Sequence, residues 1–121
     1  MISRFDHRAL LTGSVLRRVD KIEDRDSWWE RRETLHLGEK GDFDWIVEID
    51  SRDNGAAKPK RVTERATGLW QVVGESNGPH FLQLMTGNGD MYSWAARPGA
   101  AGEHLINNKS WQRSAATLER V

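Results

Sequence analysis

Residues 42–50 of the chain read DFDWIVEID. The apolar side chains of this stretch occupy every second position: Phe43, Trp45, Val47 and Ile49. Acidic residues occupy the positions between them, except for Ile46. Successive side chains of a β-strand point to opposite faces of the sheet, so this alternation predicts a strand with one face in the core and one in water.

The same period of two continues on both sides of this stretch, and tight turns interrupt it at short intervals. Residues 53–55, 76–79, 87–90 and 98–102 contain the Gly, Asn, Asp and Pro residues that favour turns. Asn107-Asn108 suits a two-residue hairpin turn, because asparagine tolerates positive φ. We therefore expect strands at residues 13–23, 28–38, 42–51, 60–67, 68–76, 80–86, 90–97, 103–106 and 109–114.

Many short strands joined by hairpins predict an all-β fold, an antiparallel up-and-down meander. A twisted sheet of eight to nine strands closes readily, and closure hides its edges. The prediction is a small β-barrel in a single domain spanning residues 1–121, and the alternative is a β-sandwich. A short N-terminal helix over Arg4–Leu11, with Phe5, Ala9 and Leu10 on its buried side, would plug one end of the barrel.

Composition excludes several classes of function. The chain has 121 residues, with 18 Lys and Arg balancing 18 Asp and Glu, so it lacks the basic excess of a general nucleic-acid binder. It has no cysteine, which excludes disulfides and sulfur-based metal sites. No stretch approaches the roughly 20 apolar residues of a membrane span, and the charged start does not resemble a signal peptide. We expect a cytoplasmic protein that contacts neither nucleic acid nor membrane and uses no cofactor.

Six tryptophans are unusual in so short a chain. They would form either an indole-filled core or an aromatic-lined cavity. The candidate ligand-binding residues are Trp29, Arg31, Glu33, Trp45, Trp70, Tyr92 and Trp94. Arg31 and Glu33 share the parity of Trp29, so they are expected to point inward and to anchor a polar or acidic ligand. The alternative is a β-bulge near Arg31 that returns both charges to solvent.

Gly68-Leu69-Trp70 and Arg113 resemble a pattern of lipocalins and their calycin relatives. In that family a Gly-x-Trp strand places an indole across the closed end of the barrel, and an arginine from a late strand packs over it. The resemblance implies a structural barrel-end pair of Trp70 and Arg113, stabilised by a cation–π contact. It also implies a lipocalin-like barrel that binds a small molecule.

The ionisable residues give no spacing typical of a metal site. The four histidines, at positions 7, 36, 80 and 104, are widely separated. His36 is expected outside the barrel, and His80 and His104 near its rim. The acidic face of residues 42–50 is expected to pair in solvent with Lys58, Lys60, Arg61 and Arg65 of the next strand.

Three functions are compatible with these features. The first is binding of a small apolar, aromatic or acidic ligand inside the barrel. The second is protein interaction, as in an immunity or adaptor protein, through Trp28, which is expected outside the core and could equally join a homodimer. The third is a barrel-fold cyclase or isomerase in which Arg31, Glu33, His80 and Tyr92 would act. The residues favour a binding protein over an enzyme and leave the ligand open.

Overall fold

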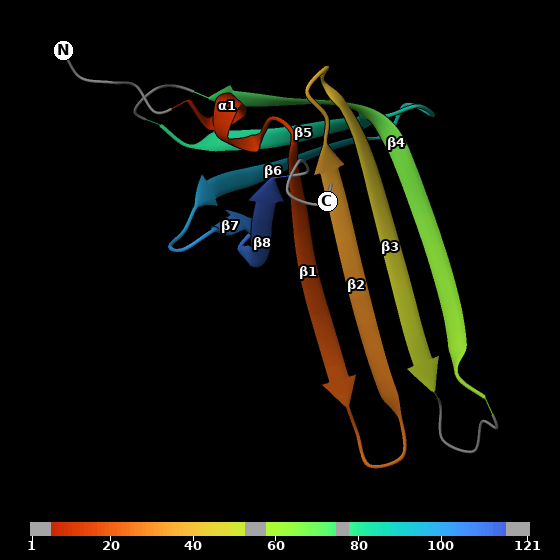
Figure 1. Ribbon diagram of the computed structural model, residues 1–121. Coiled ribbons are helices and arrows are strands. Elements are labelled where there is room, and N and C mark those ends of the chain that lie inside the picture. Colours follow the sequence, from red (N-terminus) through yellow and green to blue (C-terminus); the bar gives the residue numbers. More distant parts are fainter. Residues whose placement is uncertain (1–5, 53–57, 75–77, 116–121) are drawn as a thin grey trace.

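A computed structural model of the chain describes residues 6–52, 58–74 and 78–115. It is one closed antiparallel barrel of eight strands in sequential order, preceded by one short helix (Figure 1). The helix is α1 (His7–Leu11). The strands are β1 (Ser14–Glu23), β2 (Trp28–Leu37), β3 (Asp42–Arg52), β4 (Lys60–Gly74), β5 (His80–Thr86), β6 (Met91–Pro98), β7 (Glu103–Ile106) and β8 (Lys109–Ala115). The barrel predicted from the alternation is therefore confirmed, and the sandwich is excluded.

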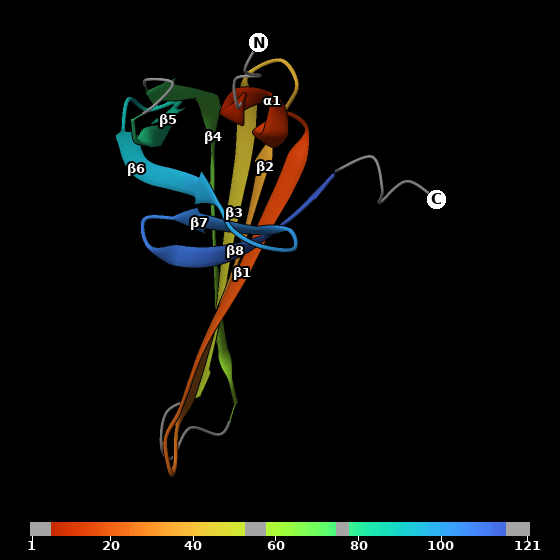
Figure 2. The same ribbon diagram turned by 90° about the vertical axis from the view of Figure 1, so that its left-hand side faces the viewer.

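The first four strands are longer than the barrel needs. β1 pairs with β2 along its whole length, but β8 pairs only with Ser14–Arg17. Residues 18–23, 28–33, 47–52 and 60–64 consequently extend beyond the barrel as a four-stranded sheet, which we call the arm. Figure 2 shows the arm at the end of the barrel opposite α1.

Residues 60–67 and 68–76 were expected as two strands. Lys60–Gly74 form the single strand β4, and positions 75 and 76 lie outside the described residues. This strand changes partners near its middle: Lys60–Leu69 pair with β3, and Gly68–Gly74 pair with β5. Gly68 lies where the two ladders overlap, and a Cβ atom placed there would lie 1.9 Å from the carbonyl oxygen of Met85. Glycine permits this close backbone approach. The strand can therefore continue through Gly68 without a break.

The core lies in the barrel near α1. Its fully buried members are aliphatic: Leu11, Leu16, Leu35, Leu37, Leu82, Leu84 and Ile106. Phe43, Trp70 and Trp111 pack with them, and the aromatic side chains of Trp45, Tyr92 and Trp94 border the cluster. Each of these residues has the inward parity of its strand, so the period of two accounts for the core.

The helix differs in detail from the prediction. The predicted start, including Arg4 and Phe5, lies outside the described residues, and α1 begins after the N-cap Asp6, whose side chain accepts a bond from the Ala9 amide. Its buried residues are His7 and Leu11, not Ala9 and Leu10. Residues four apart lie on one helix face, so one apolar and one polar side chain face the barrel. The sequence did not predict that His7 would be on the buried face of the helix.

One turn follows the sequence closely. Asn107 and Asn108 both have positive φ, at 54° and 62°, as a primed hairpin turn requires. Among the described residues, no helix is long and apolar enough to cross a membrane.

We predict that Gly68→Ala lowers the free energy of unfolding by at least about 3 kcal/mol, because the added methyl group collides with backbone that cannot move aside. Gly87→Ala is the matched control, since the nearest atom to its added Cβ is 4.0 Å away, and its effect should stay within about 0.5 kcal/mol. Urea denaturation measures both. Equal effects of the two substitutions would contradict the role given to Gly68.

Candidate functional site

Arg31 and Glu33 lie on the inner face of the sheet, as the parity argument predicted. The β1–β2 register runs unbroken from Ser14 to Glu23, so no bulge turns them outward. Glu33 is buried and accepts bonds from Arg18 Nη1 at 2.8 Å, Arg31 Nη2 at 3.3 Å and Trp45 Nε1 at 3.2 Å. Arg18 also pairs with Asp20. This network satisfies the Glu33 carboxylate at the junction between barrel and arm.

Three of the predicted aromatic residues meet across the barrel. Trp45 of β3 contacts Tyr92 and Trp94 of β6 edge to face, with ring centroids 5.4 Å apart in both pairs. Because β3 and β6 are not neighbouring strands, these rings bridge the interior. The bond from Trp45 to Glu33 fixes the indole, so the aromatic cluster and the charged network form one unit.

The other predicted aromatic residues lie apart from this unit. Trp29 and Trp28 are on the arm, on its inner and outer faces respectively, and both are partly exposed. Trp70 is buried near α1 and donates from Nε1 to the carbonyl oxygen of Gly38 at 2.9 Å.

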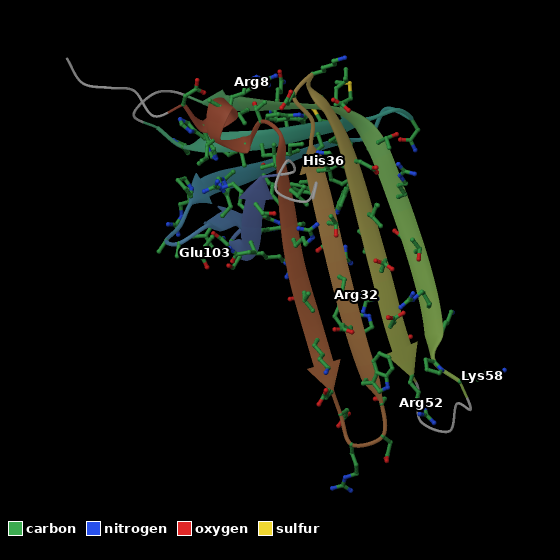
Figure 3. The ribbon with its side chains drawn as sticks, viewed as in Figure 1. Arg8, Arg32, His36, Arg52, Lys58 and Glu103 are labelled. Carbon is green, nitrogen blue, oxygen red and sulfur yellow. The ribbon has the colours of Figure 1, made fainter. Side chains whose placement is uncertain are left out.

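The guanidinium over the Trp70 ring belongs to Arg8 of α1, 4.6 Å from the ring centroid. Figure 3 shows Arg8 beside the helix at that end of the barrel. Arg113, the partner that the calycin pattern implies, acts electrostatically on His7 and His104 instead, and its buried Nε has no hydrogen-bond partner. The barrel end is therefore closed by an indole and an arginine, with the arginine supplied by the helix.

Of the four basic residues predicted to pair with the acidic face of β3, Arg61 and Arg65 do so. Lys60 has the opposite parity and lies on the inner face, and Lys58 makes no ion pair within the described ranges. Arg65 binds Asp44 through two bonds, and Arg61 binds Asp50 in the same way. Arg32 of β2, labelled in Figure 3, adds a further bond to Asp50 at 2.8 Å. These guanidinium groups hold the pKa of the Asp50 carboxyl well below its ordinary value. The face is a solvated ion-pair network.

Three histidines that are far apart in the sequence meet beneath α1. His7 Nε2 lies 2.7 Å from His104 Nε2, and His7 Nδ1 lies 3.1 Å from His80 Nδ1. His7 comes from the helix, His80 from β5 and His104 from β7. His7 and His104 are buried. We call this arrangement the histidine chain.

His7 and His104 are neutral at physiological pH. Burial lowers the pKa of His7 and of His104 to about 4, and the charges of the neighbouring histidines and of Arg113 act in the same direction. A neutral imidazole has one N–H and one acceptor nitrogen, so His7 must donate to one neighbour and accept from the other. His104 Nδ1 is buried without a partner. A buried acceptor is tolerated better than a buried donor, which favours the chain in which His104 donates to His7 and His7 donates to His80.

A pocket of about 440 Å³, open to solvent, lies beside the histidine chain. His7 and His80 line it together with Arg97 and Asn108, and its remaining lining is mainly apolar: Gly78, Pro79, Ala95, Ala96, Pro98 and Leu105. Arg97 has no acidic partner within the part of the chain that the structure describes. The pocket therefore combines an apolar wall, the imidazoles of His7 and His80 and an exposed cation, which is a combination typical of small-molecule sites.

The histidines are arranged as a chain and not around a single point. His7 uses a different ring nitrogen for each neighbour, and across the described ranges no group of three His, Asp or Glu side chains is placed to hold a metal ion. Sequence reasoning placed His80 and His104 near the rim but did not bring them together with His7. The available signal was a histidine on a helix predicted to plug the barrel.

Comparisons with known proteins gave no match: no family model matches the chain, and no curated protein or solved structure is significantly similar to it.

The histidine chain makes stability depend on pH. The histidines of the unfolded chain take up protons near pH 6.5, whereas folded His7 and His104 do so only near pH 4. Between these values the unfolded state binds more protons, so the free energy of unfolding should fall as pH falls from about 6.5 to 4. His104→Gln should reduce the proton uptake on unfolding by about one.

Urea denaturation at a series of pH values measures this uptake. His36→Gln is the control, because His36 lies exposed on the outer face, and it should keep the wild-type slope. A His104→Gln protein with the wild-type slope would contradict the buried, neutral chain.

Proposed function

We propose that this protein binds a small acidic molecule with an apolar or aromatic body in the pocket beside the histidine chain. The observation that carries the proposal is the lining of this pocket. Pro79, Ala95 and Leu105 offer an apolar wall, and Arg97 offers a cation to a carboxylate. Such a role is similar to that of lipocalins, to which the Gly68-Leu69-Trp70 pattern bears a resemblance.

The histidines support binding more than proton transfer. A general base works best when its pKa lies near the working pH, and the pKa of His7 is lowered to about 4. A neutral histidine instead contributes a hydrogen bond of fixed direction, because its neighbours in the chain set its tautomer. We therefore favour a carrier or sensor over the cyclase or isomerase that the barrel fold also permits. The cytoplasmic location expected from the sequence stays a prediction.

The predicted aromatic site contributes in a different way under this proposal. Trp45, Tyr92 and Trp94 fill the interior on the arm side of the core, and Glu33 is occupied by three donors. This rigid unit holds β3 and β6 at a fixed separation. Since β6 carries Ala95 and Arg97 into the pocket wall, the aromatic unit positions the proposed site.

We predict that benzoate, indole-3-acetate or octanoate binds with a Kd between about 1 µM and 1 mM, and that the matching amide binds at least about tenfold more weakly. Arg97→Gln should remove the preference for the acid. Calorimetry measures the affinities, and backbone amide NMR shifts of residues 95–97 locate the site.

Two tryptophan substitutions on β6 test the location. Ala95→Trp should abolish binding by filling the pocket, whereas Ser93→Trp should leave it unchanged, because Ser93 is exposed on the same strand face but does not line the pocket. Absence of acid binding by the unmodified protein, or binding that survives Ala95→Trp, would overturn the proposal.

A further inference from the structure

The first half of β4 has a neighbouring strand on one side only. It pairs with β3 from Lys60 onward, but its pairing with β5 begins at Gly68. Residues 60–65 are all exposed. In Figure 3 this edge begins beside the labelled Lys58, at the far end of the arm. The carbonyl oxygen of Thr67 accepts from the Gly87 amide at 3.0 Å, so the backbone groups on the outer side of residues 60–66 are the ones without a partner strand among those described.

An unpaired strand edge favours the addition of another strand. Natural edges are often protected by charged side chains, a bulge or a proline. The β3–β4 register is continuous from Lys60 to Leu69 and contains no bulge or proline, so the protection of this edge lies in its charged side chains. The edge is thus straight over about the length of an average strand. Whether another strand adds there depends on which side chains would meet.

Two charged side chains on this edge differ from the others on the arm. Arg61 and Arg65 are held by Asp50 and Asp44 on the outer face. Lys60 and Glu64 have no ion-pair partner within the described ranges. Both have the parity of Val62, so all three side chains lie on the inner face of the arm.

A second copy of the chain can satisfy both charges. Two identical strands can pair antiparallel about a two-fold axis perpendicular to the sheet. The axis then lies midway between one residue and the same residue of the second copy, and we name the axis by that residue. With the axis at Val62, Val62 faces its own copy, Arg61 faces Thr63, and Lys60 faces Glu64. By symmetry the Lys60–Glu64 pair forms twice, and no like charges face each other.

The neighbouring positions of the axis are unfavourable. An axis at Arg61 or at Glu64 places that residue opposite its own copy, and an axis at Thr63 places Arg61 opposite Arg65 twice. Like charges directly opposite one another destabilise a sheet. Among axes from Arg61 to Glu64, only the one at Val62 pairs opposite charges without opposing like ones.

The other unpaired edge of the arm, on β1, lacks such a position. An axis at Asp20 or at Lys21 places that residue opposite its own copy, and an axis at Val19 needs Lys21 opposite the basic Arg17, a position where β8 is already paired. An axis at Ile22 places Lys21 opposite Glu23, but these two residues already pair with each other within the chain, and it also places Asp20 opposite Asp24. Like charges meet in each of these arrangements. The edge of β4 is therefore the one whose charges complement a second copy.

We propose that two copies of this chain form a dimer by pairing their β4 edges antiparallel about Val62, with reciprocal Lys60–Glu64 ion pairs. The two arms then make one eight-stranded sheet. Val62 and its cross-strand neighbour Ile49 then form one apolar row with the same residues of the second copy. The second copy covers the side chain of Val62, which is 38% exposed in the single chain. The interface leaves the pocket beside the histidine chain untouched.

Charge reversal tests the interface. Sedimentation velocity between about 1 and 300 µM, a range that brackets a micromolar Kd, should show a concentration-dependent dimer of the unmodified chain. Lys60→Glu and Glu64→Lys should each weaken dimerisation at least about tenfold, because each creates two like-charge pairs. The double variant should regain dimerisation, since it restores opposite charges at both pairs without changing the net charge.

Lys109→Glu, an exposed charge reversal on β8, is the control and should dimerise like the unmodified chain. Circular dichroism of each variant checks that the barrel is folded. If a single reversal weakened dimerisation only by unfolding the arm, the double variant would not regain it. A monomer at all concentrations would overturn the proposal. So would a dimer that resists both single reversals, which would point instead to another surface, such as the exposed row Leu69, Met85 and Met91.

Discussion

The close backbone approach of Gly68 to Met85 determines the shape of this protein. At that point β4 leaves one partner and takes up the next. The residues before Gly68 extend the sheet into the arm, and the residues after it close the barrel. A side chain at this position would force the two ladders apart. The arm, the barrel wall and the position of β5 therefore all depend on one residue without a side chain.

Polar groups at each end of the barrel are held by different means. Near the arm, buried Glu33 is satisfied by Arg18, Arg31 and Trp45, so the charge is balanced by direct partners. Beneath α1, His7 and His104 are instead kept neutral by burial. The first arrangement gives both oxygens of a carboxylate at least one donor and is structural. The histidines beneath α1 border a pocket. We therefore assign the Glu33 network to the scaffold and the histidines to the candidate site.

The sequence predicted what depends on local pattern. The alternation in residues 42–50 and the Asn107-Asn108 turn led to the barrel, and parity placed Arg31 and Glu33 inside. It divided β4 in two, because the change of partner from β3 to β5 at Gly68 depends on neighbours across the sheet that a local pattern does not contain. It could not assemble His7, His80 and His104, since their contact depends on where the helix settles after the barrel has closed. Nor could parity show that Arg8, and not Arg113, would lie over Trp70.

The central claim is that His7 and His104 are buried, neutral and hydrogen-bonded to each other beside a mainly apolar pocket. Long-range proton–nitrogen NMR correlations of the imidazole rings, recorded from pH 8 to pH 3, test it most directly. The account predicts that both rings keep a single neutral tautomer through the mildly acidic range and take up protons only near pH 4. Protonation of both rings near pH 6.5, the value for a histidine in water, would show that the helix does not bury them and would remove the basis of the proposed site.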